Sequence, residues 1–139
     1  MDMDSDFSIE VGATLKRTIN LSTLDIVRFA QLTSDEAPHH MDAAAAQAMG
    51  FEREMAHGLL VLSLTGQLTS AVLEETKRTG VTYGYDNVRF MSPVYPETPL
   101  DLEYTVKELR EDKPIVVGDL RAWQQEKLCM SAQHLLFLT

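Results

Sequence analysis

The sequence predicts an α+β fold in which an antiparallel β-sheet wraps around a single central helix. Residues 58–75 begin with an apolar run, Leu59-Leu-Val-Leu62, which indicates a helix buried on most of its sides. From Leu100 to Lys107 apolar and polar residues alternate, as in a strand with one buried face and one wet face. A sheet that curves around the helix can bury the apolar surfaces of both elements.

The first elements of the chain are expected to be a strand and a helix. Ala13–Asn20 has a strand pattern, and Ser22 is a suitable N-cap for a helix that ends near Thr33. Residues 34–40 are expected to form a loop, because Pro38 lacks an amide hydrogen and disfavours helical dihedral angles before it. This loop contains two carboxylates and two histidines.

A short helix and a second loop are expected next. Asp42 is positioned to cap a helix over residues 43–49, and Gly50 supplies the residue that commonly closes one. The second loop then runs to His57, directly before the central helix.

The central helix carries a stripe of small residues. Ser63, Gly66 and Ser70 are three and four positions apart, so they share one face of the helix. Two interpretations stay open: the stripe packs closely against the sheet, or it also clears space for a ligand.

Three further segments complete the predicted sheet: Val81–Phe90, Pro114–Trp123 and Lys127–Leu138. Turns are expected at Glu111–Pro114 and Gln124–Glu126. Because a single open sheet leaves an edge strand unpaired, two copies are expected to pair as a homodimer.

Composition limits the class of protein. With 139 residues, 45% of them hydrophobic, the chain is expected to form one domain, residues 1–139. A formal net charge of −9 argues against nucleic acid and anionic membranes as partners, since both would be repelled. The same charge would repel a phosphate-rich ligand unless Lys or Arg side chains gather near its site.

Location and redox state follow from the N-terminus and the cysteine content. The start of the chain, Met1–Phe7, is acidic where a signal peptide would be basic, and no apolar run approaches the about 20 residues that span a bilayer. We therefore expect a cytoplasmic protein. The lone cysteine, Cys129, cannot form an internal disulfide and is expected to be a buried strand residue.

Asp35, His40 and Gly58 are the candidate catalytic groups. Asp35 and His40 are separated by five residues and a kink at Pro38, which allows both side chains to converge on one water molecule. The amide of Gly58 would lie at the amino end of a buried helix, where free N–H groups favour negative charge. Hydration of a conjugated double bond requires such groups: a base toward water, a proton donor to carbon, and a donor to the enolate oxygen.

Simpler interpretations of the same residues stay open. Asp35 could cap a turn, and the histidines could be ordinary loop residues. His57 either contacts a substrate or is an exposed or satisfied residue at the helix entrance. A metal site is not expected, because neighbouring histidines such as His39 and His40 rarely converge with tetrahedral geometry in an irregular loop.

Three motifs resemble those of the MaoC-like family, which includes the R-specific enoyl-CoA hydratases. Asp35, Pro38 and His40 match the Asp, Pro and His of its Asp-x-Asn-Pro-x-His pattern. Ala56-His-Gly-Leu-Leu60 is similar to its Ala-His-Gly-Met helix start, and Tyr85–Val94 is similar to its Arg-Phe-x-x-Pro-Val strand. Together with the elements around them, the motifs cover the region from about residue 15 to residue 108.

The resemblance implies a dimeric hotdog fold and an acyl-thioester hydratase or dehydratase. In such an enzyme Asp35 and His40 would activate water, and the Gly58 amide would donate to the thioester carbonyl. Substrates would be trans-2-enoyl or (R)-3-hydroxyacyl thioesters of coenzyme A or acyl carrier protein, without a further cofactor. His57, Ser63 and Gly66 would then be candidate substrate contacts.

The sequence departs from the family pattern beside the dyad. Ala37 replaces the Asn that helps to hold the dyad and its water, and Ser34 replaces a Gly. Two other functions therefore stay open: a hotdog thioesterase, and a non-catalytic hotdog protein that binds acyl groups.

Overall fold

A computed structural model of the chain describes residues 7–139 and contains a five-stranded antiparallel sheet with strand order β1-β3-β4-β5-β2. The strands are β1 Thr14–Asn20, β2 Gly80–Phe90, β3 Pro99–Leu109, β4 Ile115–Gln124 and β5 Lys127–Leu138. The predicted antiparallel sheet is thus confirmed. The acidic residues 1–6, on which the expectation about a signal peptide rests, lie outside the described part of the chain.

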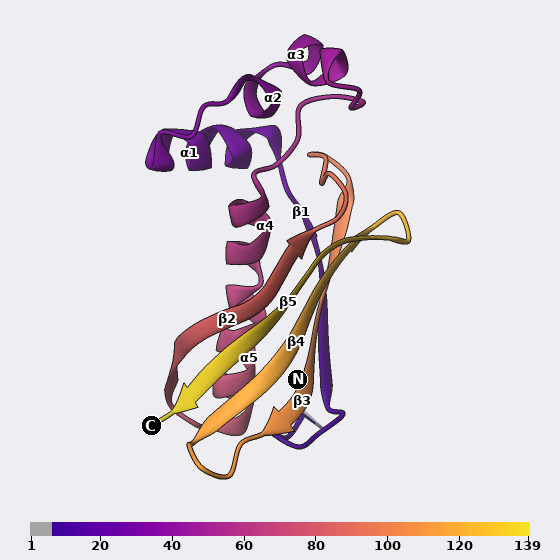
Figure 1. The fold of residues 1–139 in the computed structure, drawn as a ribbon. Coiled ribbons are helices and arrows are strands. Elements are labelled where there is room, and N and C mark those ends of the chain that lie inside the picture. Colours follow the sequence, from indigo (N-terminus) through magenta and orange to yellow (C-terminus); the bar gives the residue numbers. More distant parts are fainter. Residues whose placement is uncertain (1–6) are drawn as a thin grey trace.

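Five helical segments accompany the sheet: α1 Thr23–Thr33, α2 Pro38–Met41, α3 Ala43–Ala48, α4 Gly58–Leu64 and α5 Gly66–Thr76. Figure 1 shows α4 and α5 running end to end along one face of the sheet, whereas α1, α2 and α3 gather beyond one end of it. Within residues 7–139, none of these helices is both long enough and apolar enough to cross a membrane.

The hydrophobic core lies between the sheet and the α4–α5 helix. On β3 the predicted alternation is confirmed: Leu100, Leu102 and Tyr104 are buried, and they belong to one cluster with Leu68 and Val72 of α5. Burial of each such side chain contributes about 1.5–3 kcal/mol to folding. The helix that carries the site is therefore fixed to the sheet along its length.

The hairpin between β4 and β5 has a two-residue turn. Gln125 and Glu126 have φ angles of 51° and 64°, the left-handed values of a type I′ turn, whose twist matches the flanking strands. Gln124, expected in this turn, instead ends β4 and is buried, where its side-chain amide bonds the backbone N–H and C=O of Tyr95 at 2.8 and 2.9 Å. It thereby holds the segment between β2 and β3 against the sheet.

Residues 34–40 were expected to form a loop throughout. This expectation is wrong for the last three residues, because Pro38 begins the short helix α2. A proline is tolerated at the first helical position, where its missing N–H would have no partner. Its effect on Ala37 is as expected, since a ψ of 140° places that residue outside the helical region. The Asp42 cap is confirmed, because its carboxylate accepts from the N–H of Ala45 at 3.1 Å.

The central helix is interrupted once, whereas a single helix was expected. Thr65 separates α4 from α5, and its N–H bonds the carbonyl of Leu62 at 3.1 Å, three residues back rather than four. The Thr65 hydroxyl donates to the same carbonyl at 2.5 Å. This second bond draws the Leu62 carbonyl away from the regular helical pattern and tightens the turn.

Candidate active site

The structure brings the predicted dyad together and adds a third residue to it. One nitrogen of His40, one nitrogen of His57 and a carboxylate oxygen of Asp35 lie within 4.8 Å of one another. Asp35 follows the end of α1, where Ser34 adopts the left-handed region with φ of 62° and turns the chain. His40 lies in α2, and His57 immediately precedes α4.

His40 is held by the loop that precedes α4. Its side chain is 8% exposed, and its Nδ1 donates to the carbonyl of Met55 at 2.9 Å, since a carbonyl can only accept. Burial lowers the pKa of His40 below its ordinary value of 6.5, the Met55 bond opposes this, and the positive charge of a protonated His57 or His39 would lower it further. The Nε2 atom of His40 is therefore available as an acceptor near neutral pH.

His57 links the loop of Asp35 to the start of α4. Its ring is 2% exposed, stacks on the ring of His40 with centroids 3.8 Å apart, and packs against Phe29 of α1 at 4.9 Å. Its Nε2 donates to the backbone carbonyl of Asp35 at 2.8 Å. His57 is thus buried, in contrast to the interpretation as an exposed residue at the helix entrance.

The Asp35 carboxylate does not cap a turn. Asp35 is exposed, and within residues 7–139 its carboxylate makes no hydrogen bond. Only its backbone N–H is bonded, to the Thr33 hydroxyl at 3.2 Å. The interpretation of Asp35 as a capping residue is therefore wrong. The carboxylate is free to bind a ligand.

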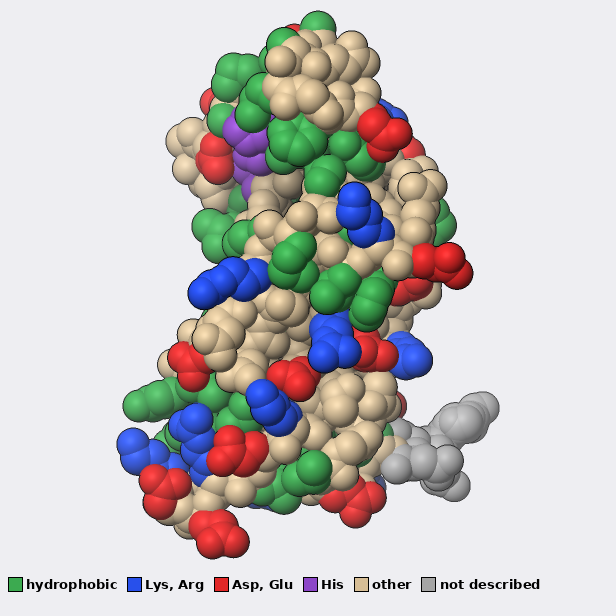
Figure 2. Space-filling model, turned by 45° about the vertical axis from the view of Figure 1, so that its right-hand side comes forward, with side chains coloured by type: hydrophobic (Ala, Val, Ile, Leu, Met, Phe, Trp, Pro, Cys, Tyr) green, Lys and Arg blue, Asp and Glu red, His purple; other side chains and the backbone are tan. Residues whose placement is uncertain are grey.

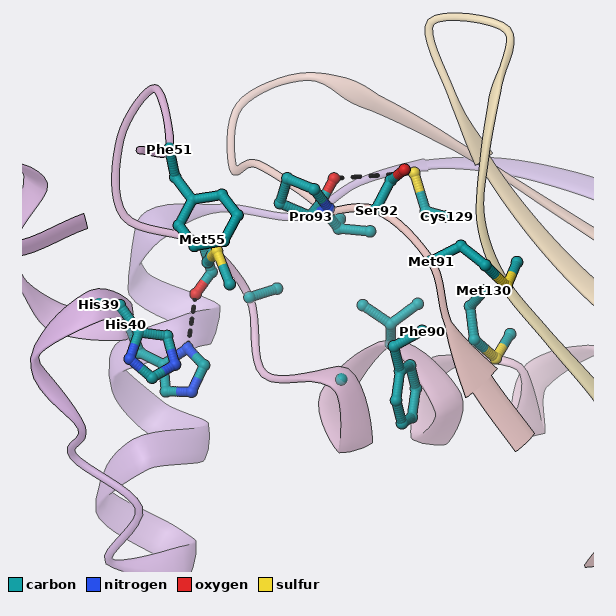
Figure 3. A pocket seen from close by; sticks show the side chains of 14 residues that line it. His39, His40, Phe51, Met55, Phe90, Met91, Ser92, Pro93, Cys129 and Met130 are labelled. Carbon is teal, nitrogen blue, oxygen red and sulfur yellow. Dashed lines mark hydrogen bonds between the residues drawn. The ribbon is translucent and has the colours of Figure 1, made fainter. Parts of the chain in front are cut away.

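A cavity of about 400 Å³ opens beside the histidines and reaches the start of α4. Figure 3 shows His39, His40 and Met55 on one side of it, with Phe90, Met91 and Met130 on the other. Gly58, the first residue of α4, lines the cavity, and the first N–H groups of a helix have no acceptor within the helix. An oxygen atom bound in this cavity could accept a hydrogen bond from Gly58.

Sequence reasoning missed most of the cavity wall. The apolar lining residues not singled out as site residues are Phe51, Met55, Ala56, Val61, Phe90, Met91, Pro93, Val94, Cys129 and Met130. Several of them lie within the two family-like motifs, Ala56–Leu60 and Tyr85–Val94, and these motifs were the only sequence signal for the wall. Their convergence depends on the pairing of Phe90 with Met130 across β2 and β5, which no local pattern specifies.

Cys129 is buried, as predicted, and lines the cavity. Burial raises the pKa of its thiol, so the reactive thiolate is disfavoured. Its Sγ lies 3.3 Å from the carbonyl of Lys127. These features suit a wall residue rather than a nucleophile.

Ser63 and Gly66 do not line this cavity. Ser63 is exposed and its hydroxyl donates to the Leu60 carbonyl at 2.7 Å, while a Cβ on Gly66 would meet nothing within 4 Å. The small-residue stripe therefore does not pack against the sheet. A role in substrate contact stays a prediction for these two residues.

One face of the molecule carries both histidine and several Lys and Arg side chains (Figure 2). Figure 2 shows histidine recessed among hydrophobic side chains in the upper part of the molecule, with Lys and Arg side chains spread over the face below. Arg89 and Lys127 are close in sequence to the cavity residues Phe90 and Cys129, and within residues 7–139 neither forms an ion pair with a carboxylate. Arg53 is already paired with Glu54 at 2.8 Å.

The site can bind and activate a small hydroxylic molecule. Two acceptors, the Nε2 of His40 and the Asp35 carboxylate, lie close together; His40 lines the cavity and Asp35 does not, and the amide end of α4 offers donors. The cavity itself is lined mainly by apolar side chains, which suit a bound acyl chain. Proton transfer combined with stabilisation of a developing oxyanion is the chemistry that this arrangement favours.

Comparison with known proteins gives a consistent family relationship. Residues 6–124 match the family described as "MaoC like domain". The chain is 32% identical over 118 residues to the (R)-specific enoyl-CoA hydratase of Aeromonas caviae, covering 85% of this chain and 86% of that protein. It is 34% identical over 87 residues to a mitochondrial 3-hydroxyacyl-[acyl-carrier-protein] dehydratase of Arabidopsis thaliana, covering 63% of this chain and 49% of that protein.

A solved structure agrees with these sequence relationships. The (R)-hydratase from A. caviae involved in PHA biosynthesis superimposes with a TM-score of 0.85 at 31% identity, covering 95% of this chain and 98% of that chain. This likeness confirms the predicted hotdog fold.

Proposed function

The chain belongs to the MaoC-like family, whose members compared above are hydratases and dehydratases of acyl thioesters, and we propose that it catalyses this reaction through Asp35 and His40. The proposed reaction is the reversible hydration of trans-2-enoyl thioesters to (R)-3-hydroxyacyl thioesters. The observation that carries the proposal is the convergence of the Asp35 carboxylate and the His40 ring beside the amide end of α4.

In the proposed mechanism, a water molecule held by Asp35 and His40 attacks C3 of the enoyl group. As the new C–O bond forms, one O–H bond of the water breaks and its proton passes to Asp35, the base toward water. The electron pair of the C2=C3 bond moves to the thioester oxygen, which the Gly58 N–H stabilises. His40 shares the water; it takes this proton from Asp35 at its bare Nε2 and delivers it to C2 on the same face of the substrate, so that both residues return to their starting protonation states. Dehydration follows the same steps in reverse.

The proposed chemistry requires no cofactor, because the thioester itself stabilises the enolate. Coenzyme A and acyl carrier protein are both proposed carriers, since the two relatives compared above are named for one and the other. Phosphate groups of either carrier could bind Arg89 and Lys127, which lack carboxylate partners within residues 7–139. The KM for crotonyl-CoA should then rise with salt, whereas that for the uncharged crotonyl N-acetylcysteamine thioester should not.

We further propose that the protein is a cytoplasmic homodimer that pairs through β2. This strand is an edge of the sheet, and large apolar side chains on it and just after it are between 37% and 59% exposed: Val81, Tyr83, Tyr85, Phe90 and Met91. Phe90 and Met91 also line the cavity, so a second copy at this edge would cover its open side. Sedimentation equilibrium should give about twice the 15.6 kDa chain mass, and a value equal to the chain mass would contradict the pairing.

Crotonyl-CoA tests the proposed function against a thioesterase. Hydration removes the absorbance of the conjugated enone without releasing thiol, whereas hydrolysis releases free coenzyme A. We expect loss of the enone absorbance, no thiol, and (R)-3-hydroxybutyryl-CoA as the product. Thiol release would support a thioesterase, and binding without turnover of short, branched and long enoyl thioesters would support an acyl-binding protein.

A further inference from the structure

His57 has one ring nitrogen that is bonded and one that is not. Its Nε2 lies 2.8 Å from the backbone carbonyl of Asp35, and because a carbonyl can only accept, Nε2 must carry the hydrogen. In the neutral ring Nδ1 is then a bare acceptor. Nδ1 is buried and has no hydrogen-bond partner among the residues that the structure describes.

The neighbouring groups are acceptors as well. His40 donates from Nδ1 to Met55, which leaves its Nε2 bare, and the Asp35 carboxylate accepts only. His40, His57 and Asp35 place one ligand atom each within 4.8 Å of one another. A buried acceptor without a donor is unfavourable by about 1–3 kcal/mol, so this cluster favours a molecule that donates hydrogen bonds.

The ring geometry favours water or a hydroxyl group over a metal ion. The rings of His40 and His57 are only 25° from parallel, with centroids 3.8 Å apart. Lone pairs in two such planes do not meet at the Zn–N bond length of about 2.1 Å. Hydrogen bonds to water are longer, near 2.8 Å, and tolerate a broader range of approach angles.

We propose that His57 binds the reacting water, or the 3-hydroxyl group of the product, through Nδ1. This inference rests on the proposed hydratase function. His57 accepts one O–H of the water, so that the other O–H points to Asp35 and His40 and the oxygen lone pair faces C3. Ala37 has no polar side-chain atom for this purpose, whereas His57, immediately before α4, stacks on His40 and has a buried Nδ1 without a partner within residues 7–139. His57 orients the water and does not take up its proton.

Two substitutions separate this role from the anchoring of Asp35. His57→Gln keeps an N–H near the position of Nε2 and loses the acceptor at Nδ1. His57→Asn keeps an oxygen near Nδ1 and loses the reach to the Asp35 carbonyl. We expect His57→Gln to lower kcat for crotonyl-CoA about 10- to 100-fold with KM within about threefold, and His57→Asn to retain several times more of the wild-type kcat than His57→Gln.

His134 provides a matched control outside the site. It is also buried, its Nε2 is bonded to the Thr82 hydroxyl at 2.8 Å, and its Nδ1 also has no partner in the described part of the chain. His134→Gln should therefore leave kcat within about threefold of wild type. A kcat for His57→Gln in this same range would overturn the proposal, as would equal losses of kcat in the two His57 variants.

Two further measurements keep the outcomes distinct. The wild-type protein and Asp35→Asn are assayed in parallel: a wild-type protein that does not hydrate crotonyl-CoA means that the proposed function itself fails, and an active Asp35→Asn overturns the role of Asp35. An inactive Asp35→Asn with an active His57→Gln overturns only the role of His57. Nitrogen-15 NMR of the wild-type protein checks the tautomers without any substitution. We expect Nε2–H on His57 and Nδ1–H on His40; an Nδ1–H tautomer on His57 would overturn the proposal.

Discussion

The aromatic ring of Phe90 lies against the backbone of Gly58 at the first turn of α4. A Cβ added to Gly58 would come within 3.0 Å of three ring atoms of Phe90. We expect Gly58→Ala to displace this ring or the proposed oxyanion donor and to lower kcat/KM for crotonyl-CoA about 10-fold or more. Phe90→Leu in the same chain should recover part of the loss. Wild-type kcat/KM in Gly58→Ala would show that the contact is not needed.

Gly66 differs from Gly58 in that a methyl group added there meets no atom within 4 Å, so the substitution should be tolerated. Gly66→Ala should stabilise α5 by about 0.5–1 kcal/mol, since alanine loses less backbone entropy in a helix. Urea unfolding measures this change. If the stripe also gives room to an acyl chain, activity should fall for long enoyl thioesters and not for crotonyl-CoA; equal activity on both would remove Gly66 from the candidate substrate contacts.

The pKa of His40 predicts the acid side of the pH profile. Burial disfavours the charged ring and lowers this pKa below 6.5, so neutral His40 persists to a lower pH than a free histidine would. The activity toward crotonyl-CoA should therefore fall only below pH 6.5. His39 contributes to the lowering through charge repulsion, so His39→Gln should move the acid limb to higher pH. A shift to lower pH would contradict this assignment.

His134 predicts a pH dependence of folding. Burial lowers its pKa to about 4, from 6.5 in the unfolded chain. The unfolded chain therefore binds an extra proton between these values, so stability is complete above pH 6.5 and falls as the pH drops toward 4, by about 3 kcal/mol in all. His134→Gln should make the free energy of unfolding less steep with pH over this range. An unchanged slope in urea titrations would contradict the assignment.

Local patterns predicted most of the fold. The alternation on β3 and the serine and aspartate caps specify their elements within a few residues, because each depends on neighbours in the sequence. The start of α2 at Pro38 and the interruption at Thr65 were missed. The first depends on the missing N–H of Pro38, and the second on the added bond from the Thr65 hydroxyl to the Leu62 carbonyl. The spacing of apolar residues does not reveal either effect.

The candidate site was predicted in part for the same reason. The separation of Asp35 and His40 across Pro38 made their convergence foreseeable, and the structure places them together. The stacking of His57 on His40 was not foreseeable, because it depends on how α2 packs against the start of α4. The contact of Phe90 with Gly58 depends likewise on the position of β2 in the sheet.

The kcat of Asp35→Asn for crotonyl-CoA tests the proposed mechanism most directly. The substitution keeps the shape of the side chain and removes its charge, and within residues 7–139 no side-chain hydrogen bond of Asp35 is lost, so the melting temperature should not change. We expect kcat to fall at least about 100-fold, because the base toward water is removed. A folded Asp35→Asn protein with kcat within a few-fold of wild type would contradict the assignment of Asp35 as the base.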